Sequence, residues 1–162
     1  MNTRLLATLF VAFGLLFAAC NKDDEGNTTP DPVDESVVRV TSNITADATW
    51  TADKVYVLGG RISVVDGVTL TIEPGTIIKG EAGTGPNATA LLIARGAKLM
   101  AEGTASAPII FTTIADEIMP DDIKAGNFAS PNLDPDISGL WGGLIVLGKA
   151  TISASNDNNE DI

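Results

Sequence analysis

The sequence has one cysteine and no histidine, and both scarcities exclude chemistry. A lone cysteine allows no internal disulfide and no zinc site built on several thiolates. The absence of histidine removes the most frequent general base and the most frequent transition-metal ligand of proteins. A catalytic site would have to be built from carboxylates and a few basic side chains, and no set of residues forms a recognisable one.

Basic and aromatic residues are also few. Ten Lys and Arg stand against 21 Asp and Glu, which gives a formal net charge of −11. This charge argues against nucleic acid or an anionic membrane surface as a partner, and it suits a soluble domain on the cell exterior. Three of the five phenylalanines lie within the first 19 residues. The core of the remaining chain must therefore be mostly aliphatic.

Only one long apolar run occurs, at residues 5–19, and it follows the basic residue Arg4. It is shorter than the roughly 20 residues that a membrane-spanning helix needs. A charged start, a short apolar core and small residues before a boundary are typical of a secretory signal peptide. The boundary, Phe17-Ala18-Ala19-Cys20, resembles the bacterial lipobox, with Phe17 where Leu or Val is usual.

The lipobox resemblance implies cleavage before Cys20 and attachment of lipid to that cysteine. Its sulfur would take a diacylglycerol and its freed amine a third acyl chain. Each buried CH₂ contributes about 0.8 kcal/mol, so three chains make a stable membrane anchor where one does not. The alternative is an ordinary secreted protein with one stray cysteine. The position of the only thiol at the cleavage point favours lipidation.

The segment after Cys20 is acidic. Lys22-Asp23-Asp24 resembles the export signal of Bacteroidetes surface lipoproteins, which implies an outer-membrane protein that faces the cell exterior. The alternative is a solvated acidic spacer. Residues 20–36 as a whole are rich in Asn, Asp, Glu, Thr and Pro. That composition predicts a flexible, disordered tether between the anchor and the folded domain.

Beyond residue 36 the sequence consists of short β-branched runs bounded by Gly, Pro or Asp, the pattern typical of strands. No helical spacing follows the signal peptide. The predicted strands are residues 37–40, 55–58, 61–65, 68–72, 76–79, 90–94, 97–101, 107–114, 144–148 and 150–153.

Some of these strands and their corners recur. Leu58–Gly67 resembles Ile93–Gly103, because both consist of a strand, a glycine corner, a second strand and an acidic-glycine corner. Residues 147–153 repeat the first half of this unit. Asp66-Gly67 alone fits a two-residue hairpin turn, whereas the other junctions do not. Repeated corners between very short strands favour a stacked coil over a hairpin sheet.

Three stretches carry a family resemblance: residues 69–78, 103–112 and 139–144. They resemble the right-handed parallel β-helix proteins of bacterial surfaces and, more narrowly, Bacteroidetes surface lipoproteins of that fold with no established activity. The resemblance implies an all-β solenoid, a right-handed parallel β-helix, over residues 37–162, with a loop insertion at 115–138. Because residues 156–162 are polar and do not look like a cap, the chain is expected to be the N-terminal part of a longer protein.

Acidic residues in the insertion form a candidate Ca²⁺ site. Calcium prefers carboxylate and carbonyl oxygens, and four aspartates offer them: Asp121, Asp122, Asp134 and Asp136. A second candidate group lies near the end of the sequence and comprises Asp157, Asn158, Glu160 and Asp161. Neither group has EF-hand spacing, and the alternative is that both are solvated acidic loops.

The sequence favours a structural, adhesive or glycan-binding role, with an extracellular glycan or protein as partner. The alternative is a polysaccharide lyase or hydrolase on the same scaffold, with an active site beyond residue 162. A glycosidase needs two carboxyls that face each other across a cleft, and the sequence cannot place such a pair. Arg61 and Arg95 fall at corners. Trp141 could stack on a sugar, although its Trp-Gly-Gly setting favours a packed corner.

Replacement of the cysteine tests the predicted anchor. Cys20→Ala is expected to abolish sedimentation with membranes, because it removes the atom that would carry the lipid. Ultracentrifugation and immunoblotting of the pellet measure this, with Asn21→Ala as the control that keeps the thiol. Retention of the Cys20→Ala protein in the membrane pellet would overturn the lipidation hypothesis.

Overall fold

The structure is a computed structural model, and it describes residues 35–150. The predicted signal peptide, Cys20 and the predicted export signal Lys22-Asp23-Asp24 lie outside the described residues. So do nearly all of the predicted tether, the acidic group at 157–161 and all but the first residue of the predicted strand 150–153.

Ten short strands in the described part of the chain form three sheets, and every strand pair is parallel. Sheet A has the order β1 (Val37–Val40), β3 (Val55–Leu58), β6 (Ile77–Gly80), β9 (Ile110–Thr113). Sheet B has the order β4 (Arg61–Val64), β7 (Ala90–Ile93), β10 (Leu144–Val146). Sheet C has the order β2 (Ala48–Trp50), β5 (Thr69–Ile72), β8 (Lys98–Ala101).

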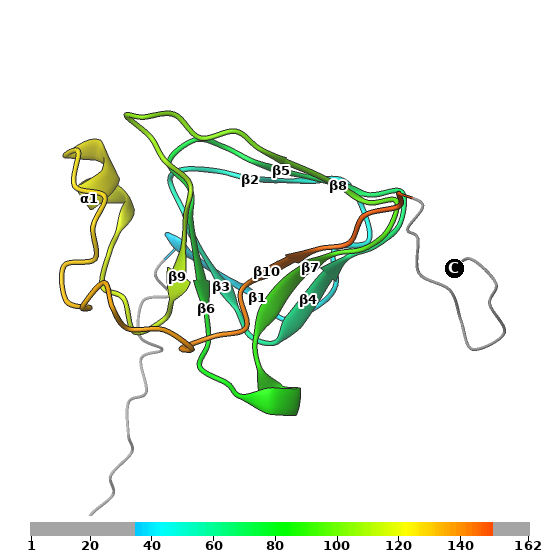
Figure 1. Cartoon of the computed structure of the whole chain (residues 1–162). Coiled ribbons are helices and arrows are strands. Elements are labelled where there is room, and N and C mark those ends of the chain that lie inside the picture. The colour runs from blue at the N-terminus through cyan, green and yellow to red at the C-terminus, as the bar shows by residue number, and fades with distance from the viewer. Residues whose placement is uncertain (1–34, 151–162) are drawn as a thin grey trace, which may run out of the picture. The chain divides into compact units, whose positions relative to one another are not determined.

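From β3 onward the chain visits the three sheets in turn, A then B then C, before it returns to sheet A one strand further along. Figure 1 looks along the resulting coil, whose three sheets are the sides of a triangle. The predicted all-β, right-handed parallel β-helix is confirmed. Each coil exposes apolar surface on both flat ends and becomes stable by stacking on its neighbours.

The interior is aliphatic, as predicted. Alternate residues of each strand point inward, and residues in register stack on one another, as Ile62 does with Leu91 and Leu70 with Leu99. One aromatic pair joins them: Trp50 and Tyr56 stack with ring centroids 4.7 Å apart. The tyrosine hydroxyl lies at the edge of this core and accepts a 2.9 Å hydrogen bond from the Thr51 N–H.

Glycines at positive φ turn the chain from sheet B to sheet C. Gly67 has φ 81° and Gly96 has φ 86°, a conformation that L side chains rarely adopt. The two corners stack directly, since the Gly67 N–H donates to the Gly96 carbonyl at 3.2 Å. Glycine is therefore required at these corners by the backbone, independently of any ligand.

The structure differs from the sequence-based prediction in three details. The three-residue strand β2 was not predicted, and the described residues contain two short helices, α1 (Pro120–Lys124) and the 3-10 turn η1 (Gly85–Asn87). Helices of that length have too few turns for a periodic apolar pattern. The predicted match of Leu58 with Ile93 is also out of register, because Leu58 pairs with Gly80 in sheet A and Ile93 with Val64 in sheet B.

A packing contact at the end of β6 generates a test. A Cβ at Gly80 would lie 2.5 Å from Cε3 of Trp141, which packs on the core. Gly80→Ala is therefore expected to displace the indole and lower the free energy of unfolding by about 1–3 kcal/mol, the usual cost of overpacking. Urea titrations in a Trp50→Phe background measure both stability and the emission of Trp141.

Gly60→Ala is the matched control, because a Cβ there would meet no atom within 4 Å. Equal effects of the two substitutions would contradict the packing argument.

Candidate functional site

The segment between β9 and β10 covers the outer face of sheet A (Figure 1). Ile118 and Ile123 from this segment are buried against Val55, Val57 and Ile77, which point outward from β3 and β6. Sheet A is thus packed with apolar side chains on both faces. The insertion is consequently part of the folded domain rather than a loose loop.

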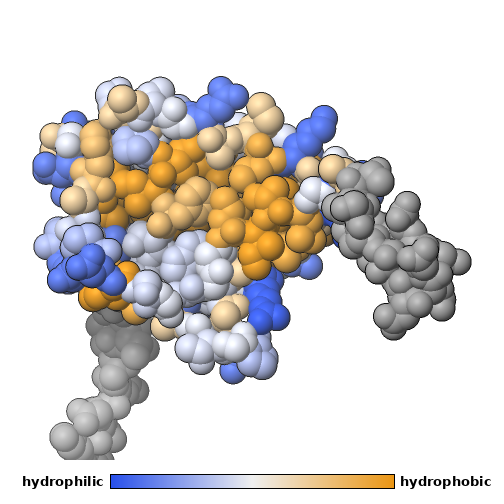
Figure 2. Space-filling view, viewed as in Figure 1, coloured by the Kyte–Doolittle hydropathy of each residue, from blue (hydrophilic) through white to orange (hydrophobic). Residues whose placement is uncertain are grey.

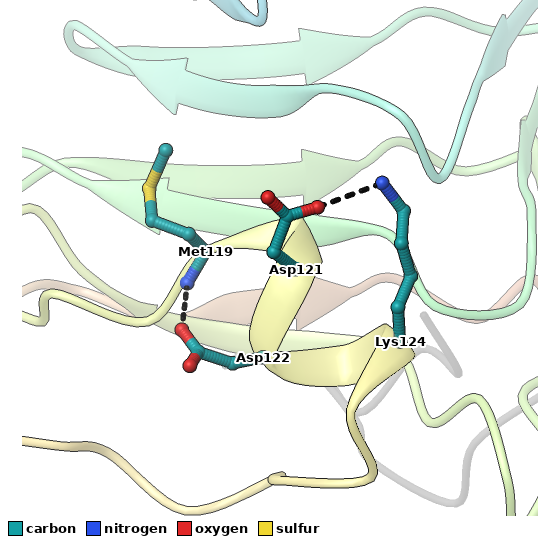
Figure 3. A network of polar contacts seen from close by, with 4 residues as sticks. All are labelled: Met119, Asp121, Asp122 and Lys124. Carbon is teal, nitrogen blue, oxygen red and sulfur yellow. Dashed lines mark hydrogen bonds and ion pairs between the residues drawn. The ribbon is translucent and has the colours of Figure 1, made fainter.

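The helix α1 within this segment is held by local polar contacts (Figure 3). Pro120 lies in the first turn of α1, where a backbone N–H would have no hydrogen-bond partner within the helix. The Asp122 carboxylate accepts a 2.9 Å hydrogen bond from the Met119 N–H. Asp121 and Lys124 pair at 2.8 Å on the surface, and this contact lowers the pKa of Asp121. These carboxylates stabilise the start of a five-residue helix.

A lysine is buried beneath the insertion. Lys79, on β6, has only 6% of its surface exposed, and its register partners are Val57 and Thr112. Its Nζ donates a 2.6 Å hydrogen bond to the backbone carbonyl of Asp116. Burial lowers the pKa of Lys79, while the negative charges of Asp116 and nearby acids oppose that shift. The ammonium thus ties the insertion to the sheet.

The Asp116 side chain completes this polar cluster. One carboxylate oxygen accepts from the Ile118 N–H at 3.0 Å and the Ser130 hydroxyl at 2.8 Å, and the other accepts from the Thr112 hydroxyl at 2.7 Å. Burial acts to raise the pKa of Asp116, but these hydrogen bonds and the charge of Lys79 outweigh it, so the pKa is lowered. Asp116 is therefore a fixed, ionised acceptor rather than a proton donor.

A cavity of about 430 Å³ lies between the insertion and the last coil. Two aromatic residues, Phe111 and Trp141, line it together with hydroxyl-bearing side chains and the exposed carboxylate of Asp134. None of the described residues that line it is basic. The lining residues include Thr112, Thr113, Asp116, Ser130, Leu133, Pro135, Ile137, Ser138 and Leu140.

Trp141 belongs both to this cavity and to a packed corner. The Gly142 N–H after it donates to the Thr89 carbonyl at 2.7 Å, an approach that a Cβ at Gly142 would block. The indole packs against the core at Gly80 and is only half-buried. Its remaining surface is available to a ligand in the cavity.

Each of the four aspartates predicted to bind Ca²⁺ takes part in a local contact with a residue nearby in the sequence. Asp121 and Asp122 serve α1, while the Asp134 carboxylate accepts a 2.9 Å hydrogen bond from the Asp136 N–H. Within residues 35–150 no three acidic or thiol side chains gather as a metal ion would require. No helix in the same range is long and apolar enough to cross a membrane.

The two corner arginines have structural settings. Arg61 donates through Nη2 to the Gly85 carbonyl at 2.8 Å and through Nε to the Ala88 carbonyl at 3.3 Å, which holds the η1 turn. Arg95 is exposed at the corner next to Gly96. Neither arginine lines the cavity.

Removal of the Asp116 charge tests the cluster. Asp116→Asn places an amide N–H₂ where two oxygens now accept hydrogen bonds, so the free energy of unfolding is expected to fall by about 1–3 kcal/mol. Because the pKa of Asp116 is lowered on folding from 3.8, its stabilising contribution is complete above that pH. It is lost as the pH falls further, through the pKa of the folded state.

The difference in stability between wild type and Asp116→Asn should therefore shrink below about pH 4. Urea titrations at neutral and acidic pH measure it, with the exposed Asp134→Asn as the control. A difference that stays constant through the acid range would contradict an ionised Asp116.

Comparison with known proteins identifies the coil. A protein-family model described as a pectate-lyase-like β-helix domain matches residues 42–125, which include every strand from β2 to β9 and helix α1. Searches of the curated proteins and of the solved structures returned no match. Since the family model matches more than half of the 162 residues, the chain belongs to the pectate-lyase-like β-helix domain family.

Proposed function

We propose that the protein is a lipid-anchored surface protein that binds a neutral glycan on its β-helix without cleaving it. The observation that carries this proposal is the cavity of about 430 Å³ beside Trp141. Its volume is that of a small-molecule site. Aromatic rings and hydroxyl groups line it together, which suits sugars because a sugar ring has both an apolar face and several hydroxyls.

The charge of the cavity favours a neutral sugar. The acidic groups in its wall are Asp116 and Asp134, and no basic residue in the described part of the chain lines the cavity, since Lys79 lies behind Asp116 and is not among the lining residues. A polyuronate would bring further carboxylates to this wall without a cation to balance them, and such like-charge contacts are unfavourable. A neutral glycan instead could donate its hydroxyl hydrogens to the free oxygen of Asp134.

The two carboxylates of the cavity wall also favour ligand binding over catalysis. A hydrolase needs two carboxyls that act together on one glycosidic bond. Asp116 accepts three hydrogen bonds within the protein and is held ionised by them, so it does not supply the protonated carboxyl that a hydrolase needs as its general acid. The second candidate function is a polysaccharide lyase or hydrolase with its active site elsewhere, and the match to a pectate-lyase-like family favours that candidate.

Anchorage at the cell surface is the other half of the proposal. It is supported by the signal-like residues 1–19, the lipobox-like Phe17-Ala18-Ala19-Cys20 and the acidic Lys22-Asp23-Asp24. A tethered domain that holds glycans would keep them near the outer membrane. The proposed partner is extracellular, in accord with the acidic net charge.

Binding and turnover are tested together. The whole protein is expected to retain neutral oligosaccharides on a glycan array and to release no reducing ends or unsaturated uronates from polysaccharides. Asp134→Ala should weaken binding about tenfold or more, because a hydrogen bond to a charged group contributes about 1.5–3 kcal/mol. Calorimetric titration with the best array ligand measures the change.

Asp121→Ala is the matched control, since Asp121 is also an exposed carboxylate of the insertion but does not line the cavity. Equal losses in the two variants would sink the assignment of the cavity. Turnover of any polysaccharide by the wild-type protein would sink the non-catalytic role and favour the enzyme.

A further inference from the structure

The two halves of the insertion are held to the domain in different ways. The first half packs on sheet A through Ile118 and Ile123, which are 0% and 6% exposed. The second half, residues 127–138, runs from α1 toward β10 along the wall of the cavity, and none of its residues is buried. Figure 2 shows hydrophobic side chains gathered over the end of the coil, whereas those around the insertion are mixed with hydrophilic ones. Apolar packing therefore holds the first half and not the second.

Backbone hydrogen bonds also do little to hold the second half. Among the described residues, one backbone–backbone hydrogen bond involves positions 128–141, and it is internal to that stretch: the Ile137 N–H donates to the Asp134 carbonyl at 3.1 Å. The strands on either side, by contrast, are bonded along their length in sheets A and B. Segments with few buried side chains and few backbone hydrogen bonds are the ones that open first in a folded protein.

Two side chains fasten the second half to the first. The Ser130 hydroxyl donates to Oδ1 of Asp116 at 2.8 Å. The Asn132 amide group donates to the Ala115 carbonyl at 2.9 Å, and its oxygen accepts from the Glu117 N–H at 3.0 Å. Ser130 and Asn132 together form a latch of three hydrogen bonds. Each of these bonds contributes only modestly to stability, so the latch can break without unfolding the domain.

A glycine at positive φ stands at each end of the second half. Gly126 has φ 80° and Gly139 has φ 75°. A Cβ at either position would meet no atom within 4 Å, so close packing does not require glycine there. Glycine does allow the backbone to move between conformations that other residues avoid. The two positions thus have the properties of hinges, where a few residues absorb a change in φ and ψ.

We propose that residues 127–138 are a lid over the cavity, which turns about Gly126 and Gly139. The lid opens when the latch of Ser130 and Asn132 breaks, and it closes when the latch forms again. Half of the residues that line the cavity belong to the lid. Its opening therefore removes one wall of the cavity, while the wall on β9 and the coil stays in place.

The lid bears directly on ligand binding, a role that rests on the proposed function. Asp134 lies on the lid, whereas Phe111 and Trp141 belong to the coil. A glycan that contacts both sides binds the closed form better than the open form, and it shifts the population toward closure. Opening lets the glycan enter and leave. The opening itself does not depend on the identity of the ligand.

Access to a thiol placed inside the cavity tests the lid without any ligand. Thr113 lines the cavity and is 3% exposed. In a Cys20→Ser background, Thr113→Cys puts the one thiol of the chain at this position. Asn132→Ala is expected to speed alkylation of this thiol by iodoacetamide at least about tenfold, because two hydrogen bonds of the latch are lost. Mass spectrometry of the full chain in detergent micelles measures the rate.

Asn127→Ala is the matched control, because the side chain of this exposed asparagine makes no hydrogen bond among the described residues. Equal alkylation rates in the Asn132→Ala and Asn127→Ala proteins would overturn the lid. Faster alkylation with loss of hydrogen-exchange protection at the Ile118 amide would overturn it too, since the first half of the insertion would then have opened as well. A glycan array that retains no ligand would contradict the proposed function and leave these rates unchanged.

Discussion

The constant length of the corner between sheets B and C keeps the coil in register. Five positions separate Val64 from Thr69 and Ile93 from Lys98, and the glycines of the two corners bond to each other. A shift of one residue would turn the inward side chains of sheet C toward solvent. The stacked rows of aliphatic residues, and hence the buried core, depend on this spacing.

The other junctions vary in length without disturbing the stack. Between β6 and β7 the chain makes the η1 turn, and between β9 and β10 it makes the whole insertion that carries α1. Extra residues at these places extend outward, because the strands before and after them keep their partners. A rigid scaffold with variable loops is the usual arrangement of binding sites, and the cavity beside Trp141 lies at the longest of these loops.

The insertion supplies the packed layer on the outer face of sheet A, and polar contacts fix the position of that layer. Apolar packing of Ile118 and Ile123 is not strongly directional, so it admits several placements of the segment. The hydrogen bonds of Lys79 and Asp116 have definite geometry and select one of them. The buried lysine thus fixes the placement of the segment, although its burial carries a desolvation cost.

Strands and fold could be predicted from the sequence because β-branched runs and glycine corners are local signals, as at Val55–Leu58 and Gly67. The register of the repeats could not, because similar glycine corners occur on different sides of the coil. Lys79 and Asp116 were missed as well. One signal for them was present: adjacent Ile77 and Ile78 face opposite sides of β6, which already indicates that both faces of the strand are covered.

The position of β1 determines how the domain would respond to a pulling force. A load applied through the chain before Val37 acts first on β1, a four-residue edge strand whose described strand partner is β3. The Val55 N–H donates to the Ser36 carbonyl at 2.7 Å at the point where the load enters. Detachment of β1 would leave the paired strands β3, β6 and β9 in place, so the domain would lengthen first by this one strand.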